Sequence, residues 1–183
     1  MPEPTAHTDT FILDNLPPED LWPEMDYSVL PELAAYPARM NAAVELLDRM
    51  AEGNGGARPA VHFGDETWSY SDLLDRANRI ARVLTEDCAM APGARVLLRA
   101  SNHPLLIASW YAILKAGGIA IPSMPVLRER ELVYMMNKAR VGIAISDTAL
   151  ADDLEAAAGH ADDLGTILYF NTDAADSLEA RMA

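Results

Sequence analysis

Apolar residues in the second half of the chain recur in short uninterrupted runs that alternate with longer stretches at helical spacing. The short runs have the length expected of buried strands, whereas the longer stretches have the periodicity of helices packed on one side. Strands that alternate with helices indicate a mostly parallel sheet with helices on both faces and right-handed crossovers. The predicted strands are 95–100, 119–122, 142–146 and 166–170, and the predicted helices are 71–85, 104–116, 129–138, 149–158 and 174–182.

The first part of the chain has a different pattern. Residues 1–30 contain several prolines with acidic residues between them, which predicts an extended segment lying over a larger body. A helix is predicted over 34–52, where apolar residues repeat at helical spacing until a glycine cluster ends the pattern. Residues 58–70 are typical of a hairpin. We therefore divide the chain into an extended N-terminal segment, 1–30, and an α/β subdomain, 31–183.

The stretch from Leu114 to Pro125 joins the end of a predicted helix to a strand. The helix before it, 104–116, is nearly all apolar, so we expect neighbours to cover it on several sides. Asn102 is expected to cap its start, with Pro104 in the first turn, and Gly117 suits the left-handed position just past its end. The short apolar strand that follows runs into a loop broken by prolines.

A second motif, Trp68–Ser69–Tyr70–Ser71–Asp72–Leu73, predicts the start of a helix. Ser69 can accept a hydrogen bond from the backbone of Asp72, whose carboxylate can reach back to Ser69, so the two residues would form a capping box. The apolar stripe of the predicted helix is formed by Leu73, Ala77, Ile80, Ala81 and Leu84.

Charge narrows the range of partners. The 183 residues carry a formal net charge of −14 and have an isoelectric point near 4.5, which argues against nucleic acid and anionic membranes as partners. Between Val141 and Ala180 the chain has many acidic residues and no lysine or arginine. Such a run predicts solvated helix faces rather than a metal site.

Cysteine usage and the N-terminus bear on location. The single cysteine, Cys88, excludes an internal disulfide and fits a reducing compartment. Residues 1–10 lack the basic and apolar regions of a secretory signal, and Lys115, glycines and prolines interrupt the apolar run 104–127. We therefore expect a cytoplasmic protein without a membrane partner.

The two motifs, 68–73 and Leu-Lys-Ala-Gly-Gly-Ile-Ala-Ile-Pro-Ser-Met-Pro at 114–125, resemble two core motifs of the adenylate-forming ligases, in the same order. This superfamily contains acyl- and aryl-CoA synthetases, luciferases and the adenylation domains of peptide synthetases. The similarity extends from Leu16 to Phe170, and it is closest to the branch of 2-aminobenzoate–CoA and benzoate–CoA ligases. The resemblance implies the N-terminal portion of such an enzyme, with a partial N-terminal lobe as its fold.

The resemblance also implies a two-step reaction. A carboxylate attacks the α-phosphate of Mg·ATP to give an acyl-adenylate and pyrophosphate, and the thiol of CoA then displaces AMP to give a thioester. The full-length parent would use ATP, Mg²⁺ and CoA with a small aryl carboxylate as substrate. Independently of the resemblance, an exposed edge of the predicted sheet could allow a homodimer to form. No nucleic acid or membrane partner is implied.

The elements that carry this chemistry have no counterpart in the sequence. They are a glycine-rich phosphate loop with a lysine, a segment that binds the ribose, and a mobile C-terminal domain, all of which lie downstream in the family. We therefore interpret the chain as a fragment of a longer ligase. The fragment itself is expected to be inactive, with no catalytic residue, no metal ligand and no bound cofactor.

Ser123, Met124 and Pro125 are the candidate cofactor-binding residues. They follow a predicted strand, where ligands approach open α/β sheets, and in related ligases this region comes near the path of CoA. The alternative interpretation is a connecting loop without ligand contact.

Other chemically suggestive residues have structural explanations. Lys115 suits the dipole at a helix end, and the adjacent residues 101–103 do not build a catalytic triad. Trp68, Trp110 and Tyr111 are expected to pack in the core rather than face a substrate. Two functions of other classes stay open from the residues alone: an autonomous doubly wound ligand-binding module, and a structural or oligomerisation unit.

Overall fold

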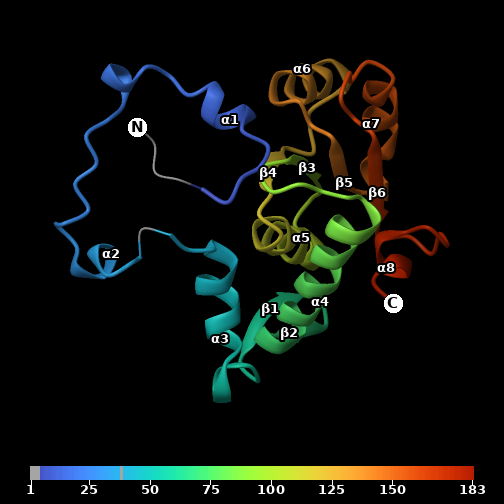
Figure 1. The fold of residues 1–183 in the computed structure, drawn as a ribbon. Coiled ribbons are helices and arrows are strands. Elements are labelled where there is room, and N and C mark those ends of the chain that lie inside the picture. Colours follow the sequence, from blue (N-terminus) through green and yellow to red (C-terminus); the bar gives the residue numbers. More distant parts are fainter. Residues whose placement is uncertain (1–4, 38) are drawn as a thin grey trace.

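A four-stranded parallel sheet lies at the centre of the computed structural model, which describes residues 5–37 and 39–183 (Figure 1). Each strand is joined to the next one in sequence through a helix, so the carboxyl ends of all four strands share one edge of the sheet. The expected parallel α/β fold is confirmed. In their order across the sheet, the strands are β4 (Ile119–Ser123), β3 (Arg95–Arg99), β5 (Ile143–Asp147) and β6 (Thr166–Phe170).

Helices cover both faces of the sheet (Figure 1). Because successive side chains of a strand alternate between the faces, each strand contributes to two cores. Leu98 and Ile145 belong to the larger core, whereas Leu97 and Ala144 belong to the smaller one. The larger core contains α4 (Tyr70–Arg82) and α5 (Pro104–Lys115), and the smaller core contains α6 (Glu129–Ala139) and α7 (Ala151–Ala158), which follows the turn η5 (Thr148–Leu150).

The predicted capping box sets the start of α4. The Ser69 hydroxyl accepts a hydrogen bond from the backbone N–H of Asp72 at 3.1 Å. The Asp72 carboxylate accepts from the N–H of Ser69 at 2.9 Å and from its hydroxyl at 2.7 Å. The stripe residues Leu73 and Ile80 are buried, and a π-helical turn, η4 (Val83–Asp87), extends the helix beyond its predicted end.

The prediction of one continuous helix over 34–52 is wrong. Pro37 lies near the start of this range, and a proline disfavours helical backbone in the residue before it. Helical structure resumes beyond Asn41, whose side chain accepts a hydrogen bond from the N–H of Ala43 at 3.0 Å. The Asn41 amide also donates to the last two carbonyls of α5, at 2.9 and 3.2 Å. The elements observed here are α2 (Pro31–Ala34), η2 (Val44–Asp48), α3 (Arg49–Ala51) and η3 (Gly53–Gly55).

The hairpin is formed as predicted, by the antiparallel strands β1 (Pro59–Phe63) and β2 (Glu66–Ser69). The last helix is shorter than predicted, because α8 (Leu178–Arg181) begins only after Ser177. The Ser177 hydroxyl accepts a hydrogen bond from the N–H of Ala180 at 3.2 Å, which makes Ser177 the cap and sets the start of the helix.

Residues 5–37 run away from the sheet as a long loop with short helical turns (Figure 1). The loop is anchored near its start: the N–H of Asp9 donates to the carbonyl of Pro92 at 2.9 Å, and the Asp9 carboxylate pairs with Arg95. The ring of Phe11 lies against the guanidinium of Arg95, with 4.9 Å between the ring centroid and the Arg95 Cζ atom. Residues 1–4 of the expected extended segment, and Ala38, lie outside the described residues. The short turns are α1 (Phe11–Asp14) and η1 (Glu19–Leu21).

The outer side of α5 is open. Ile107 is 37% exposed and Trp110 is 44% exposed, because the neighbours of the helix, the sheet and α4, cover only its inner side. The expectation of a core position is therefore wrong for Trp110, whereas Trp68 and Tyr111 are half-buried against the larger core. Within residues 5–37 and 39–183, α5 included, no helix has the length and apolar content needed to cross a membrane.

Candidate functional site

Polar side chains form a row at the carboxyl edge of the sheet. Ser123 of β4 lies level with Arg99 of β3, Arg99 lies level with Ser146 of β5, and Ser146 pairs with Tyr169 of β6. Residues at one level of a sheet share a face, and here it is the face of Leu97, covered by α6 and α7. Because ligands of open α/β sheets bind beyond the carboxyl ends of the strands, this edge is the candidate site.

The three residues predicted from the sequence lie together at this edge. Ser123 ends β4, and its hydroxyl is buried without a hydrogen-bond partner among the residues that the structure describes. Met124 is 61% exposed and starts a turn in which the N–H of Leu127 donates to the Met124 carbonyl at 3.1 Å. Pro125 takes the second position of that turn, where its fixed φ is favourable.

Arg99 belongs to the same site, although the sequence pattern does not indicate a functional role for it. Its side chain is fully buried, and it donates hydrogen bonds to the carbonyls of Met124 (3.0 Å), Pro125 (3.2 Å) and Leu127 (2.9 Å). Burial lowers the pKa of Arg99, and the nearby Asp153 carboxylate opposes this shift. An arginine at the end of an apolar strand normally suggests a solvent-facing end, and the central position of β3 that buries Arg99 is known only from the structure.

The other strand ends at this edge are held by carboxylates. Asp147 ends β5, is 7% exposed, and accepts hydrogen bonds from the N–H of Ala149 at 2.9 Å and from the Asn171 side chain at 3.2 Å. Glu179 of α8 accepts from the N–H of Asn171 at 2.7 Å. Each carboxylate therefore accepts at least one hydrogen bond from the protein, although Glu179 Oε2 is buried without a partner among the residues that the structure describes. Among the described residues, no three His, Cys, Asp or Glu side chains form a group that could hold a metal ion.

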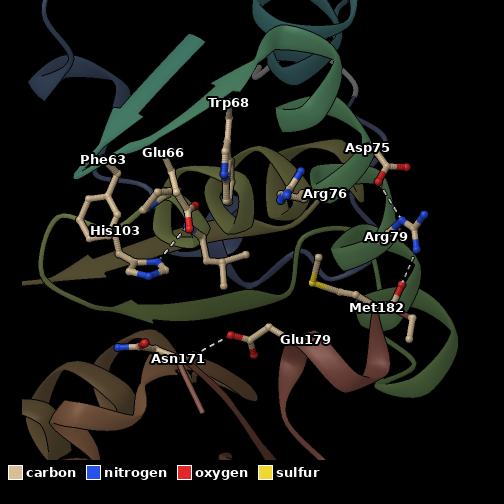
Figure 2. Close-up of a pocket in the computed structure, with 13 residues that line it drawn as sticks. Phe63, Glu66, Trp68, Asp75, Arg76, Arg79, His103, Asn171, Glu179 and Met182 are labelled. Carbon is tan, nitrogen blue, oxygen red and sulfur yellow. Dashed lines mark hydrogen bonds and ion pairs between the residues drawn. The ribbon is translucent and has the colours of Figure 1, made fainter. Parts of the chain in front are cut away.

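A pocket of about 650 Å³ lies between the hairpin, α4, the start of α5 and α8 (Figure 2). The His103 ring packs against Phe63 and Phe170, with centroid distances of 5.1 and 5.2 Å. The Nδ1 atom of His103 accepts a hydrogen bond from the N–H of Leu105 at 3.1 Å, so His103 caps α5 and the expected cap at Asn102 is wrong. The residue directly before the proline that opens α5 has extended backbone, which suits an N-cap.

The cations of this pocket are already bound to their neighbours (Figure 2). The guanidinium of Arg76 lies over the Trp68 ring at 4.1 Å, and Arg79 pairs with Asp75 at 2.9 Å. Glu66 also lines the pocket, so its charge is mixed. Such a lining does not fit the polyphosphate of a nucleotide, which requires free cations and converging N–H groups.

The remaining reactive side chains have structural contacts. The Lys115 ammonium pairs with Asp48 at 2.6 Å and thereby ties the end of α5 to η2. The His103 ring accepts its hydrogen bond from the N–H of Leu105 in α5, so it serves as a helix cap and not as a member of a triad with Ser101 and Asn102. The Cys88 thiol is half-buried, and burial raises its pKa, which is the opposite of the shift that activates a nucleophilic cysteine.

Comparison with known proteins relates this architecture to one family. The sequence model described as "AMP-binding enzyme" matches residues 47–181. The chain is 26% identical over 137 residues to the mitochondrial acyl-coenzyme A synthetase ACSM3 of Homo sapiens, a match that covers 70% of this chain and 23% of the synthetase.

Solved structures share the fold. An anthranilate CoA ligase, AuaEII, in complex with anthranoyl-AMP, aligns with a TM-score of 0.74 at 21% identity, covering 86% of this chain and 28% of that one. A benzoate CoA ligase from Burkholderia xenovorans aligns with a TM-score of 0.67 at 22% identity, covering 79% and 28%. The chain thus spans less than a third of each of these proteins.

Proposed function

The chain belongs to the AMP-binding enzyme family, and on that premise we propose that it forms the N-terminal part of an ATP-dependent aryl-CoA ligase acting on 2-aminobenzoate or benzoate. The family match over residues 47–181 carries the proposal, because it includes both the Ser69 capping box and the helix–glycine–strand segment that starts at Leu114. The likeness in fold to an anthranilate and a benzoate CoA ligase supports the aryl acid as substrate.

The proposed reaction has two steps. The carboxylate of the aryl acid attacks the α-phosphate of ATP, which forms an acyl-adenylate and releases pyrophosphate. The sulfur of CoA then attacks the acyl carbon, loses its proton and displaces AMP, so that a thioester remains. ATP, Mg²⁺ and CoA would be the cofactors of the complete ligase, which we place in the cytoplasm.

The described residues do not themselves fit Mg·ATP. Within residues 5–37 and 39–183 no cluster of carboxylates or histidines suits a metal ion, and the arginines of the pocket beside α4 are already bound to protein groups. We therefore assign adenylation to parts of the complete ligase outside these residues, and we derive no step of it from this chain.

CoA is the ligand that we assign to the carboxyl edge of this chain, at Ser123, Met124 and Pro125. These residues form an exposed turn directly after β4, and the Met124 side chain points to solvent. An exposed apolar side chain on a fixed turn suits contact with the flexible arm of CoA rather than with its phosphates.

The test is a pair of assays on the polypeptide encoded by the complete reading frame and on residues 1–183 alone. With 2-aminobenzoate or benzoate, the complete polypeptide should catalyse exchange of pyrophosphate into ATP, and it should form a thioester only when CoA is added. An aliphatic acid is the control substrate. Residues 1–183 alone should show neither reaction, so pyrophosphate exchange by this fragment would refute the assignment of adenylation to other parts of the ligase.

A structural or oligomerisation role is the second candidate, because residues 21–36 expose many large apolar side chains. β4 and β6 also form the two outer edges of the described sheet, and an open edge can pair with another chain. Light scattering of residues 1–183 and of the complete polypeptide distinguishes the two: self-association of both forms favours a homodimer, and self-association of the fragment alone means that the rest of the ligase covers these surfaces. The exposed side chains include Leu21, Trp22, Met25, Tyr27, Val29, Leu30 and Tyr36.

A further inference from the structure

The turn after β4 presents its side chains outward and its carbonyls inward. Met124 and Val126 are 61% and 72% exposed. The carbonyls of Met124, Pro125 and Leu127 face the sheet, where each accepts a hydrogen bond from the Arg99 guanidinium. A single buried side chain therefore binds three carbonyls of this turn.

Arg99 makes these contacts in place of an ion pair. It is fully buried, and no carboxylate forms an ion pair with it among the residues that the structure describes. The nearby Asp153 carboxylate is paired with another arginine, Arg128, at 2.8 Å. The desolvated charge of Arg99 is thus compensated by three carbonyl dipoles of one turn.

Burial in a sheet does not by itself favour an arginine. A buried charged group can often be replaced by an apolar residue of similar size without loss of stability, so its presence here calls for a geometric reason. The planar guanidinium supplies five N–H donors in a rigid fork, which allows it to bind three separate carbonyls at once. Lysine, with one nitrogen, cannot reproduce this arrangement.

We infer that Arg99 is a positioning residue for CoA: it holds the turn from Met124 to Leu127 in the orientation that presents the Met124 side chain to the arm of CoA. This inference rests on the proposed function, because it uses the assignment of CoA to Ser123–Pro125. Arg99 does not touch the ligand itself. It acts through the three carbonyls that it binds.

The first test measures the turn directly, in residues 1–183, by amide hydrogen exchange. Arg99→Met removes the donors and Arg99→Lys keeps the charge without the fork, while Arg82→Met changes an exposed arginine of α4 as the control. In both Arg99 variants the Leu127 amide should exchange at least about tenfold faster, as expected when hydrogen bonds from a charged donor are lost. Amides of β5 should keep their protection, which shows that the fold is retained. Unchanged exchange at Leu127 in Arg99→Lys would overturn the inference.

The second test separates positioning from folding in the complete ligase. The Arg99→Lys enzyme should have a KM for CoA raised by about tenfold, while its rate of pyrophosphate exchange and its KM for ATP stay unchanged. A parallel loss of exchange and thioester formation would mean that Arg99 only maintains the fold, and the inference would be wrong. An unsubstituted enzyme that forms an adenylate but no CoA thioester would instead refute the proposed function, whatever the exchange at Leu127.

Discussion

Removal of the capping box at the start of α4 should destabilise the whole domain. In Ser69→Ala the backbone N–H of Asp72 loses its acceptor, and the Asp72 carboxylate loses the hydroxyl that donates to it at 2.7 Å. Loss of such an N-cap costs about 1 kcal/mol, with a range of roughly 0.5–2 kcal/mol. For a domain of this size, that loss lowers the Tm by about 2–4 °C.

Urea denaturation followed by circular dichroism measures the effect. The midpoint should fall without a change in slope, because the substitution leaves the surface exposed on unfolding unaltered. Ser71→Ala is the matched control, since Ser71 is an exposed serine two residues further along, in the first turn of the same helix. A double-mutant cycle with Asp72→Ala should give a coupling of about 0.5–1 kcal/mol, because the two side chains act as one unit.

The pH dependence provides an independent check. The hydrogen bonds from the Ser69 hydroxyl and N–H lower the pKa of Asp72 in the folded state. A lowered folded pKa means that this part of the stability is present above the unfolded pKa and is lost as the pH falls through the folded pKa. The cost of Ser69→Ala should therefore shrink in acid. A cost no larger than that of Ser71→Ala, or strict additivity in the cycle, would refute the reasoning.

Two further predictions concern the N-terminal anchor and the buried row of polar residues. Gly93 has a φ of 92°, and a Cβ there would collide with the Asp9 carbonyl, so Gly93→Ala should cost more than about 1 kcal/mol and speed proteolysis of the first residues. Gly159→Ala, where the nearest atom lies 4.0 Å from the added Cβ, is the control and should be nearly neutral. Burial, with the Glu155 carboxylate, raises the pKa of Tyr169 to about 12, so one tyrosine should ionise last in a spectrophotometric titration and disappear from it in Tyr169→Phe. Because the pKa of Tyr169 is raised in the folded state, its contribution to the free energy of unfolding is fully present below the pKa of the unfolded chain, near 10, and is lost as the pH rises toward 12. A Tyr169 pKa near 10 in the folded protein would contradict this prediction.

The sheet and its helices could be predicted because local and tertiary preferences agree there. The pattern predicts both ends of β6 correctly, since the mostly apolar run between Gly165 and Asn171 has the length and composition of a buried strand. The capping box was also predictable, because its two members lie three residues apart and need no distant partner.

The predictions are wrong where the conformational preference of a proline competes with the hydrophobic periodicity, or where residues distant in sequence determine how exposed a side chain is. The apolar spacing over 34–52 continued across Pro37, but the steric effect of the proline prevailed. At the start of α5, Asn102 has the stronger general preference for an N-cap, yet the backbone before the proline placed His103 in that position. Trp110 is a large apolar residue of the kind usually found in a core. It is exposed because no neighbouring helix in the described part of the chain covers its side of α5, and the sequence pattern does not show this arrangement.

The candidate site also contains residues that the local sequence predicts and one residue whose role depends on distant parts of the chain. Ser123, Met124 and Pro125 could be proposed because a residue after a predicted strand must lie at the edge of the sheet. Arg99 could not, because its role depends on carbonyls 25 to 28 residues away in sequence, and backbone carbonyls leave no mark on the side-chain pattern. The residue that orients this turn is therefore recognisable only once the register of β3 and β4 brings Arg99 level with Ser123. Any site built from backbone acceptors will be hidden from sequence patterns in the same way, even where the strands that carry it are predicted correctly.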